Sequence, residues 1–187
     1  MTQHRGASFS YLILPAGPAD AEALAQVHVA AWRETYRGLL PDAFLARMSE
    51  AGHARRFRRE LERPGPHDVT LAAMNPYGVF GYVSGGPSRA PGAEGEAEIA
   101  TLYVLRQAQG RGVGRRLLTD AVRALAARGA QSLAISVLAE NAQARAFYEH
   151  LGGVAEAPRE AHGPGGRVWE ATYRWAEIRT LLSSPPA

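Results

Sequence analysis

The first third of the chain combines one short apolar run with segments of helical periodicity. The apolar run over Phe9–Leu14 is closed by proline and glycine, which predicts a strand. Behind Asp20, an expected N-cap, apolar residues recur every three to four positions and predict a helix over Ala21–Tyr36. A short helix over Asp42–Met48 and a longer one over Ser49–Leu61 are expected to follow. This part of the chain should therefore be mainly helical.

The pattern changes to strands in the middle of the chain. The segments Val69–Met74 and Val79–Ser84 flank a short turn with proline and glycine, which predicts two antiparallel strands. Gly85–Glu96 is rich in glycine and proline and is expected to be a flexible surface loop. A third strand is predicted over Glu98–Leu105. Three consecutive strands without an intervening helix are unlike a parallel βαβ unit.

The last part returns to alternating helices and strands. A glycine-rich segment, Gln109–Gly114, leads into a strongly amphipathic helix that begins at Val113 and should end before Gly129. The remaining predicted elements are a strand over Leu133–Leu138, a helix over Asn141–His150, a loop over Gly163–Gly166 and a strand over Val168–Trp175. We expect one domain with its core at about residues 9–176 and flexible tails at 1–7 and 181–187.

Two absences narrow the chemistry of this 187-residue chain. It has no cysteine, and all 21 residues of its Lys+Arg count are arginine. Without these residue types there is no thiol nucleophile, disulfide, thiolate metal site, lysine Schiff base or Walker-type phosphate lysine. The histidines His28, His53, His67 and His162 lack metal-ligand spacing, so we expect no metal.

The charge balance does not require a nucleic-acid partner. The pI of about 9.6 reflects arginine, which does not titrate, and 18 acidic residues leave a net charge of only +3. The densest basic cluster, Arg55 to Arg59, is typical of a solvated helix face. No window reaches 18 apolar residues, and the first ten residues lack a signal-peptide pattern. We therefore expect a cytoplasmic protein that binds neither nucleic acid nor membrane.

The glycine-rich segment has the properties of an anion site. Glycines let the backbone approach a ligand closely, and a helix start offers free N–H groups at the positive end of the helix dipole. Arg111, Arg115 and Arg116 add positive charge there. A phosphate or pyrophosphate group is the natural ligand. A plain surface turn with solvated arginines is the alternative.

Two common phosphate motifs do not fit this segment. A Walker loop needs lysine, which the chain lacks. A dinucleotide fingerprint needs Gly-x-Gly-x-x-Gly, but Arg115 stands three residues after Gly112. Both common nucleotide-binding folds are therefore disfavoured.

The pattern Gln109-x-x-Gly112-x-Gly114, between a strand and a long helix, resembles the Gln/Arg-x-x-Gly-x-Gly/Ala motif of the GCN5-related N-acetyltransferases (GNAT). A second segment resembles that family's Asn-x-x-Ala-x-x-x-Tyr-x-x-x-Gly pattern, with Asn141, Ala144, Phe147, Tyr148 and Leu151-Gly152-Gly153. The resemblance covers about residues 69–175 well and 27–45 more loosely.

The resemblance implies the α+β GNAT fold, a central, mixed, mostly antiparallel twisted sheet with helices on both faces. It also implies acetyl-CoA as cosubstrate, wedged between two parallel strands that splay apart, here Glu98–Leu105 and Leu133–Leu138. The residues implied to bind it are Leu102, Tyr103 and Val104 along the pantetheine arm, Gln109, Gly110, Arg111, Gly112, Val113, Gly114 and Arg115 around the pyrophosphate, Asn141 beside the arm and Tyr148 beside the sulfur.

The implied reaction is direct transfer of the acetyl group from the thioester to an amine. An aliphatic amine has a pKa of about 10, so a base or a water chain must remove a proton before attack. Tyr148 is the implied acid for the leaving thiolate. Glu98 matches a glutamate often used as base in this family, with ordered water as the alternative. Ser136 replaces a glutamate of ribosomal-protein N-terminal acetyltransferases, which argues against that specificity.

The acceptor is expected to be a primary amine of a small molecule or peptide. Trp32 and Tyr36 stand four apart on the first long helix, so one face could present both rings to the acceptor, although core packing explains them equally well. Glu94, Glu96 and Glu98 could attract a cationic amine. Homodimers are common in this family, so the resemblance allows one. The alternative function is a non-catalytic acyl-CoA-binding module.

Overall fold

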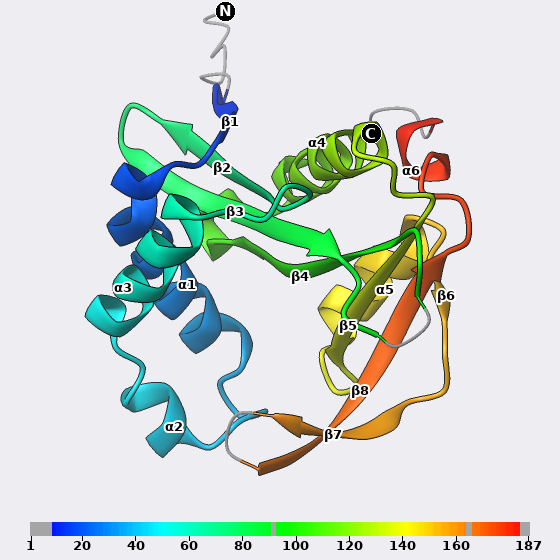
Figure 1. Cartoon of the computed structure of the whole chain (residues 1–187). Helices are drawn as coiled ribbons and strands as arrows, with labels where there is room; N and C mark the ends of the chain where they lie inside the picture. The colour runs from blue at the N-terminus through cyan, green and yellow to red at the C-terminus, as the bar shows by residue number, and fades with distance from the viewer. Residues whose placement is uncertain (1–8, 91–92, 164–165, 184–187) are drawn as a thin grey trace, which may run out of the picture.

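The computed structural model describes residues 9–90, 93–163 and 166–183. A mixed, mostly antiparallel sheet of eight strands is flanked by helices on both faces, which confirms the expected fold class (Figure 1). The strands are β1 (Leu12–Pro15), β2 (Val69–Asn75), β3 (Gly78–Pro87), β4 (Glu96–Val104), β5 (Ser132–Leu138), β6 (Val154–Ala155), β7 (Arg159–Gly163) and β8 (Gly166–Trp175). The α-helices are α1 (Ala21–Thr35), α2 (Asp42–Ala46), α3 (Glu50–Glu62), α4 (Val113–Ala127), α5 (Ala142–His150) and α6 (Thr180–Ser183).

The centre of the sheet contains a parallel strand pair that separates. The strand order is β1-β2-β3-β4-β5-β8-β6, with β7 paired to β8. β4 and β5 run parallel but pair only over Glu96–Glu98 and Ser132–Ala134. Beyond these three pairs β4 continues along β3, whereas β5 continues along β8. The two strands therefore splay, and the peptide groups on their facing edges are left for another partner.

Helices bury the two faces of the β2–β4 region in separate clusters. The apolar stripe of α4, with Leu117 and Leu118 at its centre, packs against one face together with Val83 and Ile99. On the opposite face α1 and α3 cover β2 and β3, where Tyr82 is fully buried. Burying a large apolar side chain contributes about 1.5–3 kcal/mol, so these stripes hold the helices to the sheet.

The expected loop over Gly85–Glu96 is shorter in the structure. β3 continues to Pro87 and β4 already begins at Glu96, so Gly85 belongs to a strand. A Cβ atom on Gly85 would lie 2.5 Å from the carbonyl oxygen of Glu98 on β4. Glycine at this position permits the close approach of β3 and β4. Composition alone does not distinguish this role from that of a glycine in a loop.

The C-terminal part also differs from the prediction. Residues 181–187 were expected to be a flexible tail, but Thr180–Ser183 forms the short helix α6 and Leu181 is buried in the α4 cluster. The Ile178 N–H donates to the Gln131 carbonyl and anchors this segment. β6 and β7 were not predicted. The expected tail at 1–7, residues 184–187 of the expected tail at 181–187, and residues 164–165 of the expected loop over Gly163–Gly166 lie outside the described residues.

Candidate active site

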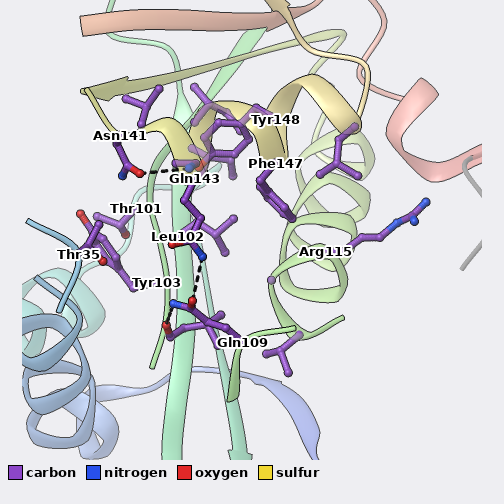
Figure 2. A pocket seen from close by; sticks show the side chains of 18 of the residues that line it. Thr35, Thr101, Leu102, Tyr103, Gln109, Arg115, Asn141, Gln143, Phe147 and Tyr148 are labelled. Carbon is purple, nitrogen blue, oxygen red and sulfur yellow. Dashed lines mark hydrogen bonds between the residues drawn. The ribbon is translucent and has the colours of Figure 1, made fainter. Parts of the chain in front are cut away.

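A pocket of about 450 Å³ lies where β4 and β5 separate (Figure 2). Its walls come from β4, the turn before α4, β5 and α5, and the end of α1 contributes Thr35 and Tyr36. The predicted binding residues that line it are Leu102, Tyr103, Val104, Gln109, Gly110, Gly112, Val113, Gly114, Arg115, Asn141 and Tyr148. The fold thus brings together two motifs that lie about thirty residues apart in the sequence.

The turn before α4 presents backbone N–H groups to this pocket. Gly110 and Gly112 have φ angles of 68° and 75°, in the left-handed region that favours glycine. Gly112 is the N-cap of α4 and supplies no side-chain cap, so the N–H groups of the first helical turn remain available. This geometry and the helix dipole suit a phosphate group.

The arginines of the turn have different roles. Arg115 lines the pocket. Arg116 points instead to Asp120, with 2.8 Å between its Nε and the Asp120 Oδ2. The Arg111 guanidinium lies over the Phe9 ring, 4.6 Å from its centroid, and Arg111 is not among the lining residues. Binding of the cofactor by the backbone N–H of Arg111 stays a prediction.

A pair of glutamine side chains crosses the pocket between β4 and α5. The Gln109 Nε2 donates to the Val104 carbonyl at 2.8 Å, and the Gln143 Nε2 donates to the Gln109 Oε1 at 3.0 Å (Figure 2). Gln143 was not predicted, because it occupies a variable position of the Asn-x-x-Ala pattern. Its contact with Gln109 depends on the tertiary fold.

The helix α5 brings Asn141 and Tyr148 to the same cavity. Asn141 caps the helix, with its Oδ1 accepting from the Ala144 N–H at 3.1 Å, and it is buried. Tyr148 is buried seven residues later, and burial raises the pKa of its hydroxyl. The phenol is therefore protonated at neutral pH and can act as a hydrogen-bond or proton donor.

The structure does not bring Glu98 to the pocket. Glu98 lies in the last paired position of β4 with β5 and is not among the lining residues. Its two carboxylate oxygens accept from Arg89, the Oε1 from Nε at 2.8 Å and the Oε2 from the backbone N–H at 3.2 Å. Arg89 belongs to the connection between β3 and β4, a contact that sequence spacing does not reveal.

The two aromatic residues predicted for the acceptor have separate positions. Tyr36 lines the pocket, and its hydroxyl lies 3.2 Å from the hydroxyl of Tyr103. Burial raises the pKa of both phenols. Trp32 packs behind Tyr36, with ring centroids 4.9 Å apart, and does not line the cavity. The site thus has an aromatic wall with two hydroxyl groups on its α1 side.

The pocket is also lined by residues that were not among the predicted binding residues. Thr101, Ser136, Gln143 and Phe147 line the cavity beside the predicted set.

Within the described ranges, no three His, Cys, Asp or Glu side chains group closely enough to hold a metal ion. In the same part of the chain, no helix has the length and apolar character needed to cross a membrane.

A protein-family model described as "Acetyltransferase (GNAT) family" matches residues 26–153, which is more than half of the chain. The chain belongs to this family. The family resemblance seen in the sequence is thereby confirmed, and with it the class of enzyme, an N-acetyltransferase.

This GNAT protein has relatives with and without a known ligand. It is 26% identical over 162 residues to an uncharacterised N-acetyltransferase, YuaI, of Bacillus subtilis, covering 87% of the chain and 91% of that protein. The crystal structure of PaiA N-acetyltransferase from Thermoplasma acidophilum, in complex with coenzyme A, superposes with a TM-score of 0.73 at 18% identity, covering 89% of this chain and 100% of that one. The structure of yncA from Salmonella typhimurium, a putative acetyltransferase with acetyl-CoA, gives 0.68 at 19% identity, with 95% and 98% covered. At these identities the two structures support the fold alone.

Proposed function

We propose that this GNAT protein transfers an acetyl group from acetyl-CoA directly to a primary amine of a small molecule or peptide. The observation that carries the proposal is the gap between β4 and β5, which has an open helix N-terminus at one end and a buried tyrosine near the other. A long thioester with a charged head and an uncharged reactive end matches this distribution of groups. Two solved relatives of similar fold contain coenzyme A or acetyl-CoA.

The proposed binding mode follows the free main-chain groups. The pyrophosphate would accept hydrogen bonds from the N–H groups of Gly110 to Arg115, with the Arg115 side chain adding charge. The pantetheine arm would replace the missing β5 neighbour along Leu102 to Val104. For this, the Gln109 side chain must release the Val104 carbonyl or share it. Asn141 would flank the arm from the start of α5.

The proposed reaction is a single transfer. The neutral amine nitrogen attacks the thioester carbonyl carbon, a C–N bond forms and the C–S bond breaks. The leaving thiolate takes the proton of the Tyr148 hydroxyl, and the amine loses one proton to a base. Because Glu98 is held by Arg89 outside the lining of the pocket, we assign the base role to ordered water and not to Glu98.

Two measurements on the wild-type chain test this proposal. Acetyl-CoA should raise the melting temperature, because a ligand that binds only the folded state stabilises it. Thiol release from acetyl-CoA should then depend on an added primary amine. Stabilisation without turnover over a broad amine panel would instead support a non-catalytic acyl-CoA-binding module. No stabilisation would contradict acetyl-CoA as the ligand.

A further inference from the structure

Two glutamine side chains link the end of β4 to α5 across the pocket. The Gln109 Nε2 lies 2.8 Å from the Val104 carbonyl oxygen, and the Gln143 Nε2 lies 3.0 Å from the Gln109 Oε1 (Figure 2). All three residues line the pocket. Together the side chains of Gln109 and Gln143 form a glutamine clasp. The reaction proposed above gives Gln143 no part.

The chemistry of these groups fixes the direction of both hydrogen bonds. A backbone carbonyl can only accept, so Gln109 must turn its NH2 group to Val104. Its amide oxygen is then the atom that meets Gln143, and an amide oxygen can only accept as well. Gln143 is therefore the donor, and it holds the Gln109 amide in the orientation that satisfies the Val104 carbonyl.

The Val104 carbonyl faces the gap between β4 and β5. The N–H of Leu105, directly after β4, donates to the Phe80 carbonyl on β3 at 2.9 Å. In an antiparallel pair, the main-chain groups of successive residues point alternately to one edge of the strand and to the other. Those of Val104 therefore point away from β3, to the edge where β5 would lie in a closed sheet. The Gln109 NH2 group takes the place of the missing N–H from β5.

The clasp lies where the pantetheine arm is proposed to run, along Leu102 to Val104 and beside α5. The arm carries amide N–H groups that would bond to the free edge of β4. An arm in this position meets the Gln109 amide at the Val104 carbonyl and the Gln143 amide on the side of α5. The clasp therefore has to open before the arm can occupy the gap.

We propose that the glutamine clasp is closed in the free protein and open in the complex with acetyl-CoA. Gln143 is a positioning residue that sets the balance between the two states, because it holds Gln109 on the Val104 carbonyl. This inference rests on the proposed function. The apparent affinity of a ligand that binds only the open state is its affinity for that state multiplied by the open fraction. Loss of the Gln143 donor should therefore tighten the binding of acetyl-CoA.

Calorimetric titration of Gln143→Ala and Gln143→Met with acetyl-CoA, without an amine, tests the proposal. Neither variant can donate to the Gln109 oxygen, and methionine keeps the length of the side chain. The dissociation constant of acetyl-CoA should fall by about two- to tenfold, the range for the loss of one ordinary hydrogen bond. A residue that only supports the fold would, on its removal, weaken this binding or leave it unchanged.

Rate constants locate the effect in the free protein. The complex contains no clasp, so Gln143→Ala should raise the association rate constant of acetyl-CoA and leave its dissociation rate constant unchanged. Surface plasmon resonance on the chain immobilised by one terminus measures both rate constants. Adenosine 3′,5′-bisphosphate, the nucleotide part of coenzyme A, lacks the pantetheine arm. Its dissociation constant should be the same in wild type and variant.

Gln107→Ala is the matched control. Gln107 lies in the short 3₁₀ helix over Arg106–Ala108, is exposed and does not line the pocket. Removal of its amide should leave the binding of acetyl-CoA at the wild-type value. Gln109→Ala removes the other half of the clasp. The double variant Gln109→Ala/Gln143→Ala should therefore bind acetyl-CoA no more tightly than Gln109→Ala alone.

The possible results separate the two proposals. Unchanged or weaker binding of acetyl-CoA in both Gln143 variants would overturn the clasp, and so would a change confined to the dissociation rate constant. Equal tightening of adenosine 3′,5′-bisphosphate binding would overturn it as well. A wild-type chain that does not bind acetyl-CoA would instead contradict the proposed function, and the clasp with it.

Discussion

Burial keeps the phenol groups around the pocket protonated. It raises the pKa of Tyr148, and it does the same for Tyr36 and Tyr103 on the α1 side. All three residues line the cavity, and none of the described residues that line it is an aspartate or a glutamate. At the scale of single residues, these hydroxyl groups are therefore available as proton donors, and ordered water is the proton acceptor that we propose.

Replacement of Tyr148 by phenylalanine tests the donor. We expect kcat to fall by about a hundredfold, the lower end of what general acid catalysis contributes, with unchanged affinity for acetyl-CoA. Thiol-release kinetics and calorimetric titration of acetyl-CoA measure the two quantities. Tyr77→Phe is the control, because Tyr77 is 97% exposed in the β2–β3 turn. Full activity of Tyr148→Phe with intact binding would remove the acid role.

Glu98 gives the complementary prediction. Because its carboxylate is paired with Arg89 and does not line the pocket, Glu98→Gln should leave the pH dependence of kcat/KM unchanged. Its effect on stability should be at most about 1 kcal/mol, as for other ion pairs of this exposure. Arg89→Ala should behave in the same way. Loss of the ascending limb of the pH profile in Glu98→Gln alone would restore Glu98 as the base.

At the scale of elements, the turn before α4 combines a conformational requirement with the proposed anion site. Gly112→Ala places a Cβ on a residue with φ of 75°, which costs about 1–2 kcal/mol. We expect a similar drop in unfolding free energy and, in addition, weaker acetyl-CoA binding, because the N–H groups at the helix start would shift.

Gly129→Ala is the matched control for this turn. Gly129 has φ of 98° at the other end of α4, and no atom beyond its two chain neighbours lies within 4 Å of its added Cβ. Urea unfolding and calorimetry should show a comparable loss of stability in both variants and weaker binding in Gly112→Ala alone. Equal affinities in the two variants would contradict the anion site.

Local patterns of the sequence predicted the elements that surround the proposed cofactor site. The amphipathic period of α4 and the Gln109–Gly114 segment lie within one continuous stretch, so both follow from short-range rules. β7 was missed because its residues are polar and lack an apolar alternation. The extension of β3 was missed because Gly85 was assigned to a loop from composition, whereas it allows β3 and β4 to lie close together. The His28–Tyr82 contact joins residues 54 positions apart, and no spacing rule reaches that far.

At the scale of the whole molecule, the buried imidazole of His28, a residue of α1, makes the stability of the fold depend on pH. The pKa of His28 is about 3 in the folded chain and about 6.5 when unfolded. Between these values the unfolded chain binds a proton that the folded chain does not. Stability is therefore full above about pH 6.5, and it falls as the pH drops toward 3. His53, whose pKa is also lowered by burial, contributes in the same direction.

Urea unfolding at pH 6.5 and pH 5 measures this linkage. The wild type should lose about 1.6 kcal/mol of unfolding free energy through His28 over this interval. His28→Gln lacks the titrating group, so its stability should change less between the two pH values, even if its stability at pH 6.5 is lower. Parallel losses in wild type and variant would show that His28 is not the source.

The central claim is that acetyl-CoA lies in the gap between β4 and β5 and gives its acetyl group to an amine in one step. The most direct test incubates the wild-type chain with acetyl-CoA that carries an isotope-labelled acetyl group. The amines offered are 2-phenylethylamine, spermidine and the dipeptide amide Ala-Phe-NH2. Labelled amide is quantified by mass spectrometry, and released thiol is measured in the same samples. We predict labelled amide from at least one amine, in equal amount to the thiol. Thiol without amide, or neither product from a chain that acetyl-CoA stabilises, would contradict the claim.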